Sequence, residues 1–132
     1  MAELAIEAHD LTKVFPGDAV AVSGLDLAVE RGTVYGLIGR NGAGKTTTLR
    51  MLMGLLLPSK GTARVLGNDL LVSPREHRQR VAYVSQRQQL HGWMTIEELS
   101  TYCSHFYDKW DADYARQLAD KFGLRWNRQV GV

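Results

Sequence analysis

The chain has 132 residues, of which 45% are hydrophobic, and a formal net charge of +2. This length fits one domain with a packed core, and so small a charge gives no reason to expect binding to nucleic acid. No apolar run reaches the roughly 18 residues that span a bilayer. The N-terminal Met1–Leu4 lacks the pattern of a signal peptide, and the single Cys103 cannot form an internal disulfide. We therefore expect a cytoplasmic chain.

The sequence predicts several strands within the first 40 residues. Residues 4–15 are predicted as a strand, and Pro16-Gly17-Asp18 as the turn that follows it. Apolar and other residues alternate over 25–30, which indicates a strand with one buried face. Residues 34–38 form a continuous, mostly apolar run, which is typical of a buried parallel strand.

Helices and short strands alternate in the middle of the chain. Apolar residues at positions 49, 52, 53 and 56 predict a helix with one buried stripe, ended by Pro58. Residues 62–66 and 81–84 are predicted as short strands. Between them, residues 75–80 predict a short helix whose basic cluster faces solvent; the cluster comprises Arg75, His77, Arg78 and Arg80.

Two helix starts are marked in the last third of the chain. Thr95–Glu98 is a capping box, which opens a helix with an apolar stripe that includes Cys103. Asp111 begins a further helix, and Gly123 is its predicted stop.

The strongest motif is Gly39–Thr46, which matches G-x-x-x-x-G-K-[ST] at every fixed position. Small residues let the backbone wrap round a phosphate chain with its N–H groups pointing inward, and the following helix adds its positive dipole end. Lys45 is predicted to bind the β- and γ-phosphates, and the Thr46 hydroxyl to hold Mg²⁺. Thr47 adds a second hydroxyl to the phosphate cradle.

The order of the motifs resembles the N-terminal part of an ATP-binding-cassette (ABC) transporter ATP-binding subunit of the bacterial exporter type. The glycine loop is close to the Walker A form of that family, and Gln86 stands where its Q-loop glutamine does. The segments that carry the likeness are 39–49, 53–61, 66–69, 81–86, 94–98 and, for the exporter subgroup, 105–111.

The resemblance implies an α/β fold of the P-loop NTPase (ABC ATPase) type, in its N-terminal portion only, with an antiparallel β edge and the start of the helical subdomain. A nucleotide-binding core is expected over 1–86 and a partial helical subdomain over 87–132. Lys45 and Gln86 are the implied catalytic residues, and Thr46 and Gln86 the implied Mg²⁺ ligands. The implied ATP-binding residues are Phe15, whose ring stacks on adenine, and Gly39, Arg40, Asn41, Gly42, Ala43, Gly44, Lys45, Thr46 and Thr47.

The resemblance also implies partners and a location. The partners are a transmembrane permease, facing the segment 86–122 with Trp93 as one contact, and a second ATP-binding subunit; no nucleic acid is expected. The location is cytoplasmic, peripheral on the inner face of the cell membrane.

Several elements of the family are missing after Gln86. The sequence contains no serine-glycine-glycine signature, no Walker B aspartate behind four apolar residues, no catalytic glutamate and no switch histidine. We therefore expect a truncated chain that binds Mg-ATP but hydrolyses it poorly, with exposed apolar edges and marginal stability. Two alternatives stay open, namely another P-loop NTPase such as a small kinase, and a truncated product without function.

Overall fold

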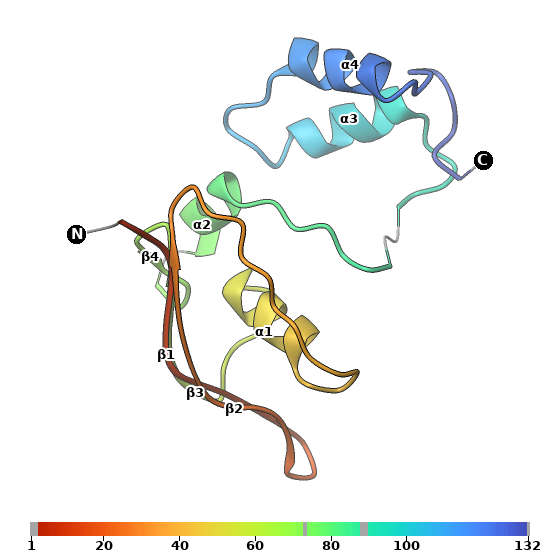
Figure 1. The fold of residues 1–132 in the computed structure, drawn as a ribbon. Helices are drawn as coiled ribbons and strands as arrows, with labels where there is room; N and C mark the ends of the chain where they lie inside the picture. The colour runs from red at the N-terminus through yellow and green to blue at the C-terminus, as the bar shows by residue number, and fades with distance from the viewer. Residues whose placement is uncertain (1–2, 73, 88–89, 132) are drawn as a thin grey trace. The chain divides into compact units, whose positions relative to one another are not determined.

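The computed structural model describes residues 3–72, 74–87 and 90–131. The chain divides into two compact units, Met1–Tyr83 and Val84–Val132. The first unit contains the strands and two helices, and the second unit contains a pair of helices (Figure 1). The predicted functional boundary after residue 86 stays a prediction.

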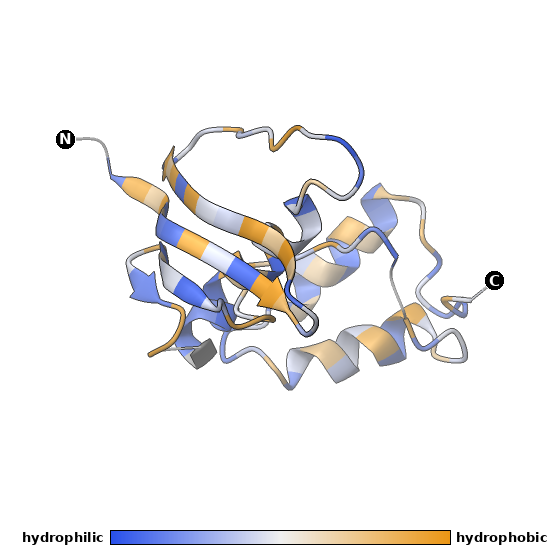
Figure 2. Ribbon diagram, turned by 90° about the horizontal axis from the view of Figure 1, so that it is seen from below, coloured by the Kyte–Doolittle hydropathy of each residue, from blue (hydrophilic) through white to orange (hydrophobic). Residues whose placement is uncertain are grey.

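The first unit is built on a four-stranded antiparallel sheet with the strand order β2-β1-β3-β4. The strands are β1 (Leu4–Phe15), β2 (Ala19–Glu30), β3 (Lys60–Val65) and β4 (Asn68–Asp69). β1 and β2 form a hairpin that closes with Phe15 opposite Ala19, which confirms the predicted turn between them. Hydrophobic and hydrophilic residues alternate in bands along the strands (Figure 2), as expected for a sheet with one buried face.

The core of this unit lies between the sheet and α1 (Lys45–Leu52). Leu11 and Met51 are almost completely buried there. The predicted helix is confirmed, but its predicted end at Pro58 is wrong, and of the predicted buried stripe Leu52 is buried whereas Leu49 is exposed. α1 ends at Leu52 because Gly54 takes a positive φ of 65° and donates its N–H to the Met51 carbonyl at 2.9 Å.

The two predicted strands at 34–38 and 81–84 are not found. Each run lacks a ladder partner among the described residues, and a strand exists only where a neighbour satisfies its backbone groups. Their apolar side chains are consequently open to water: Val34 and Ile38 are almost completely exposed, and Val84 is 82% exposed. The expected exposed apolar surface is therefore present.

The short helix α2 (Pro74–Arg80) confirms the helix predicted there, but the placement of His77 on its solvent-facing side was wrong. His77 is completely buried, whereas Arg78 and Arg80 are exposed. Neither ring nitrogen has a well-formed hydrogen bond among the described residues. Burial lowers the pKa of His77 and the Arg78 guanidinium lowers it further, while the nearby backbone of Leu52 and Met53 acts in the opposite direction.

Acid is expected to destabilise the first unit through His77. Above its ordinary pKa of about 6.5 the ring is neutral in both folded and unfolded chains. Below that pH the unfolded chain takes up a proton that the buried ring resists, so the free energy of unfolding falls as the pH drops through about 6.5. Urea titrations at about pH 7.5 and about pH 5.5 measure this loss.

His77→Leu should reduce the difference between the free energies of unfolding measured at these two pH values. His91→Leu, which replaces an exposed histidine, should leave that difference in place. An equal loss of stability in the wild type and in His77→Leu would show that the acid sensitivity has another source.

The second unit contains α3 (Ile96–Ser104) and α4 (Ala112–Lys121). The predicted capping box is confirmed: Glu98 donates its N–H to the Thr95 hydroxyl at 3.2 Å, and the Glu98 carboxylate accepts the Thr95 N–H at 2.8 Å. Asp111 caps α4 by accepting the Tyr114 N–H at 2.8 Å, and Gly123 follows its end with a φ of 66°. No helix among the described residues has the length and apolar character required to cross a membrane.

Candidate nucleotide-binding site

The predicted phosphate loop is curled and leads directly into α1. Gly42 and Gly44 adopt positive φ angles of 84° and 83°, a region that glycine enters without steric cost. Ala43 donates its N–H to the Arg40 carbonyl at 3.1 Å, which closes a turn inside the loop. The first helical hydrogen bond runs from the Thr48 N–H to the Gly44 carbonyl at 2.8 Å.

The loop is packed against β2. A Cβ atom placed on Gly44 would lie 2.2 Å from the Ala21 carbonyl oxygen and 3.0 Å from Val22 Cγ2. Any side chain at this position would therefore push the loop away from the sheet. Val22 belongs to the core cluster together with Met51, so the loop and α1 are held against the same part of the sheet.

The loop presents backbone donors. The described residues provide no acceptor for the N–H groups of Gly42, Gly44, Lys45, Thr46 and Thr47. α1 has no acidic residue in its first turn and no side-chain cap, so nothing neutralises the positive end of its dipole. Free amides at an uncapped helix start form an anion site.

The Lys45 side chain folds back over the loop. Its ammonium nitrogen donates to the Gly39 carbonyl at 2.6 Å and to the Arg40 carbonyl at 2.8 Å. The positive charge is thus already on the loop, on the same residue that begins α1. A phosphate bound to the loop amides would lie within reach of this ammonium group.

Three threonines follow Lys45, and the turn of the helix gives their side chains different degrees of exposure. Thr46 is exposed, Thr47 is half-buried and Thr48 is buried with 3% of its surface accessible. The Thr46 hydroxyl is free to meet a hydrated cation, and oxygen is the ligand that Mg²⁺ prefers. The residues therefore fit the predicted Mg-nucleotide.

Phe15 lies at the end of the hairpin on the same strand pair that supports the loop. It is 39% exposed and pairs with Ala19, two residues before the Ala21 carbonyl that meets Gly44. The Lys13 ammonium lies 5.3 Å from the centre of its ring, which covers one side of the aromatic system. An exposed aromatic ring on this hairpin offers a stacking surface for a purine.

Gln86 belongs to the second unit, whereas the loop belongs to the first, and its side chain is exposed. The positions of the two units relative to each other are not determined. The structure thus holds the loop against β2 and places Phe15 on the neighbouring strand β1, while the predicted roles of Phe15 and Gln86 stay predictions.

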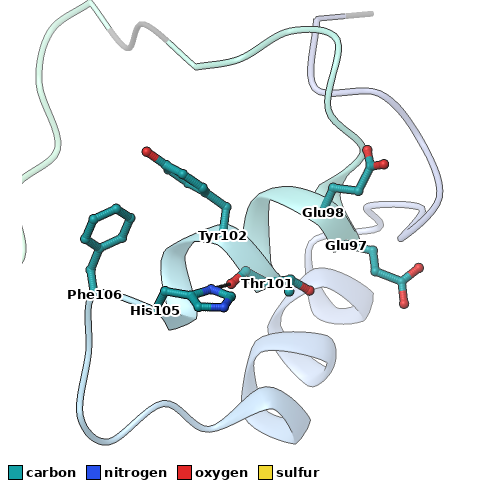
Figure 3. A pocket seen from close by; sticks show the side chains of 6 residues that line it. All are labelled: Glu97, Glu98, Thr101, Tyr102, His105 and Phe106. Carbon is teal, nitrogen blue, oxygen red and sulfur yellow. Dashed lines mark hydrogen bonds between the residues drawn. The ribbon is translucent and has the colours of Figure 1, made fainter.

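The second unit carries an exposed aromatic surface beside α3, shown in Figure 3. An open pocket of ≈ 520 Å³ is lined by Glu97, Glu98, Thr101, Tyr102, His105 and Phe106. The rings of Tyr102 and Phe106 lie edge to face at 5.1 Å, and His91 links Tyr102 to Trp93 through ring contacts of 5.9 and 6.0 Å. Trp93 itself is largely exposed. The resemblance implies that the segment 86–122 faces a permease with Trp93 as one contact, but it does not indicate which other side chains form this surface.

A curled glycine loop with free amides, a lysine folded over it and a helix behind it define a P-loop nucleotide-binding protein. The model of the ABC transporter family matches residues 22–131, and the chain belongs to that family. The segment matched includes both the loop and the helices of the second unit.

Proteins of similar sequence support the assignment to this family. The chain is 40% identical over 126 residues to the probable multidrug ABC transporter ATP-binding protein YbhF of Escherichia coli, covering 93% of this chain and 22% of that protein. It is 42% identical over 124 residues to the daunorubicin/doxorubicin resistance ATP-binding protein DrrA of Streptomyces peucetius, covering 91% of this chain and 37% of that protein. The chain thus spans only a minor part of these two relatives.

A solved structure described as an ATP binding subunit of an ABC transporter superposes with a TM-score of 0.82 at 29% identity, covering 95% of this chain and 54% of that chain. The predicted family and the α/β P-loop fold are thereby confirmed. The alternative of a small kinase is excluded by the same match.

Proposed function

We propose that these residues bind Mg-ATP as part of a subunit that powers export across a membrane. The observation that carries this proposal is the loop itself, in which the Lys45 ammonium is folded over free amides; these belong to Gly42, Gly44, Lys45, Thr46 and Thr47. Because the chain belongs to the ABC transporter family, we infer that the nucleotide is ATP. The relatives named above concern multidrug transport and drug resistance, and others concern Nod factor export, which supports export as the direction.

Within this proposal each site residue has one task. The loop residues 39–47 hold the phosphates, and Lys45 neutralises the β- and γ-phosphates. The Thr46 hydroxyl and the Gln86 side-chain oxygen are the proposed ligands of Mg²⁺. Phe15 stacks on the adenine through the ring face that Lys13 leaves open.

The partners are a transmembrane permease and a second ATP-binding subunit, with the protein peripheral on the cytoplasmic face of the membrane. The support for a permease contact is the exposed surface of Trp93, Tyr102 and Phe106 in the segment after Gln86. Aromatic residues of this kind are enriched at the centres of protein interfaces. Gln86, at the start of that segment, would report the state of the nucleotide to the permease.

The 132 residues by themselves should bind Mg-ATP but turn it over negligibly. Phosphoryl transfer needs a group that positions the attacking water and a further Mg²⁺ anchor, and no Walker B aspartate, catalytic glutamate or switch histidine follows Gln86 in this sequence. Calorimetry with Mg-ATP and a phosphate-release assay on the same preparation measure the two properties separately.

The proposed function predicts a measurable heat of Mg-ATP binding in calorimetry. It predicts no steady release of phosphate in the assay. Turnover at ordinary enzyme rates, on the order of 1–100 per second, would show that these residues contain a complete catalytic apparatus. An absence of any binding would remove the proposed function altogether.

A further inference from the structure

The buried histidine of α2 lies against the C-terminal end of the helix that follows the phosphate loop. His77 is completely buried, and a Cβ atom placed on Gly54 would lie 3.7 Å from the Cδ2 atom of its ring. The backbone of Leu52 and Met53, at the end of α1, also lies beside the ring. The ring therefore packs against the end of α1 that is opposite Lys45.

α1 is a short rod that is held at both ends and in the middle. Its 8 residues span about 12 Å. The N-cap residue Gly44 meets β2, and the middle of the helix is buried through Thr48 and Met51. The C-terminal end meets His77. Because so short a helix moves as a unit inside a close-packed core, a shift of its C-terminal end also displaces the loop amides at its N-terminal end.

The surroundings of the His77 ring favour its neutral form. A neutral imidazole carries one N–H donor and one acceptor nitrogen, whereas the protonated ring carries two donors and a charge. Neither nitrogen has a well-formed hydrogen bond among the described residues, and a charge buried without a partner is costly. The ring must therefore leave its place to take up a proton.

The charged groups near the ring do not offset this cost. Arg78, the next residue of α2, carries a charge of the same sign as a protonated ring. Neither Asp69 of β4 nor Glu76 of α2 forms a hydrogen bond with the ring. The remaining described charged side chains of α1 and α2 near this contact are the exposed Arg50 and Arg80. No carboxylate of these elements thus stabilises a proton on His77.

We propose that His77 is a positioning residue for the nucleotide, whose neutral ring supports the C-terminal end of α1 and so keeps the loop amides aligned on the phosphates. The inference rests on the proposed function, in which the loop binds Mg-ATP. Protonation of the ring removes this support, so acid weakens Mg-ATP binding. By the reciprocity of linked equilibria, bound nucleotide must oppose protonation of the ring.

The test is calorimetry with Mg-ATP at about pH 7.5 and about pH 5.5 on the wild type, His77→Leu and His91→Leu. Each affinity is referred to the folded fraction, measured by circular dichroism on the same samples. Protonation of the nucleotide itself affects all three proteins alike. The wild type should lose roughly tenfold more affinity on acidification than His77→Leu, whose side chain fills the site without titrating. His91→Leu is the matched control and should behave as the wild type, because His91 is exposed and belongs to the second unit.

An equal loss of affinity in the wild type and in His77→Leu would overturn the proposal. If His77→Leu does not fold, a nuclear magnetic resonance titration of the wild-type histidine rings decides the question. Saturating Mg-ATP should lower the pKa of His77 and leave the titration of His91 unchanged, and an unchanged titration of His77 would refute the proposal. Absence of Mg-ATP binding at the higher pH would remove the proposed function together with this inference, whereas equal acid losses remove the inference alone.

Discussion

Lys45→Ala should abolish Mg-ATP binding in calorimetry. The ammonium of Lys45 is held on the loop by the Gly39 and Arg40 carbonyls, where it meets the phosphates bound by the neighbouring amides. Charge-assisted hydrogen bonds to phosphate are among the strongest that a side chain forms. Their loss should weaken binding by roughly a hundredfold or more, which places the affinity outside the range of the measurement.

Lys121→Ala is the control for this change. Lys121 lies in the last turn of α4 in the second unit, so its replacement alters the net charge equally and changes no residue of the loop. It should bind Mg-ATP as the wild type does. Equal affinity in Lys45→Ala and in the wild type would contradict the assignment of the loop as the nucleotide site.

Gly61→Ala should strongly destabilise the first unit. Gly61 has a φ of 86°, and a Cβ on it would lie 2.3 Å from the Asp10 carbonyl oxygen and 2.5 Å from that of His9. The positive φ alone costs about 1–3 kcal/mol for a residue with a side chain. The clash with β1 adds to this, because the strands can relieve it only by separating where the pairing of β1 and β3 already shifts between His9 and Thr12.

Urea unfolding measured against Gly67→Ala separates the two contributions. Gly67 has a similar φ of 79°, but a Cβ there meets nothing within 4 Å, so this variant carries the backbone strain without the clash. We expect Gly67→Ala to lose about 1 kcal/mol of unfolding free energy and Gly61→Ala several times more, a large part of the roughly 5–15 kcal/mol typical of a domain. Similar losses in the two variants would mean that β1 yields to the added methyl group.

Features that depend on a few neighbouring residues were predictable from the sequence. The turn at 16–18, the capping box that begins at Thr95 and the cap at Asp111 each involve contacts within four positions along the chain. The curled loop is likewise set by its own glycines at positions 42 and 44. Such local chemistry forms in the same way whatever surrounds it.

Features that depend on distant residues were missed. Residues 34–38 have the composition of a buried strand, but a strand also needs a partner, and its own sequence does not contain one. His77 sits among arginines, so the sequence favoured solvent, yet tertiary packing buries its ring beside the end of α1. A local pattern cannot indicate which elements will cover a side chain.

The same limit applies to the candidate site. The loop residues were predicted individually, but their support by the Ala21 carbonyl and Val22 was not, because 22 or more positions separate these residues from Gly44. The only sequence signal was the requirement for glycine at position 44. This requirement indicates that another part of the chain packs closely against position 44, but it does not identify that part. The distance between Gln86 and the loop depends on how the two units meet and lies beyond any local pattern.

The bare run at 34–38 has a practical consequence. An unpaired run with uncovered valine and isoleucine side chains is a segment on which another molecule can add a strand. We therefore expect this run to lower the solubility of the isolated chain, whose formal charge is only +2. Whether the protein stays monomeric or precipitates should depend on its concentration and on whether another polypeptide pairs with this run.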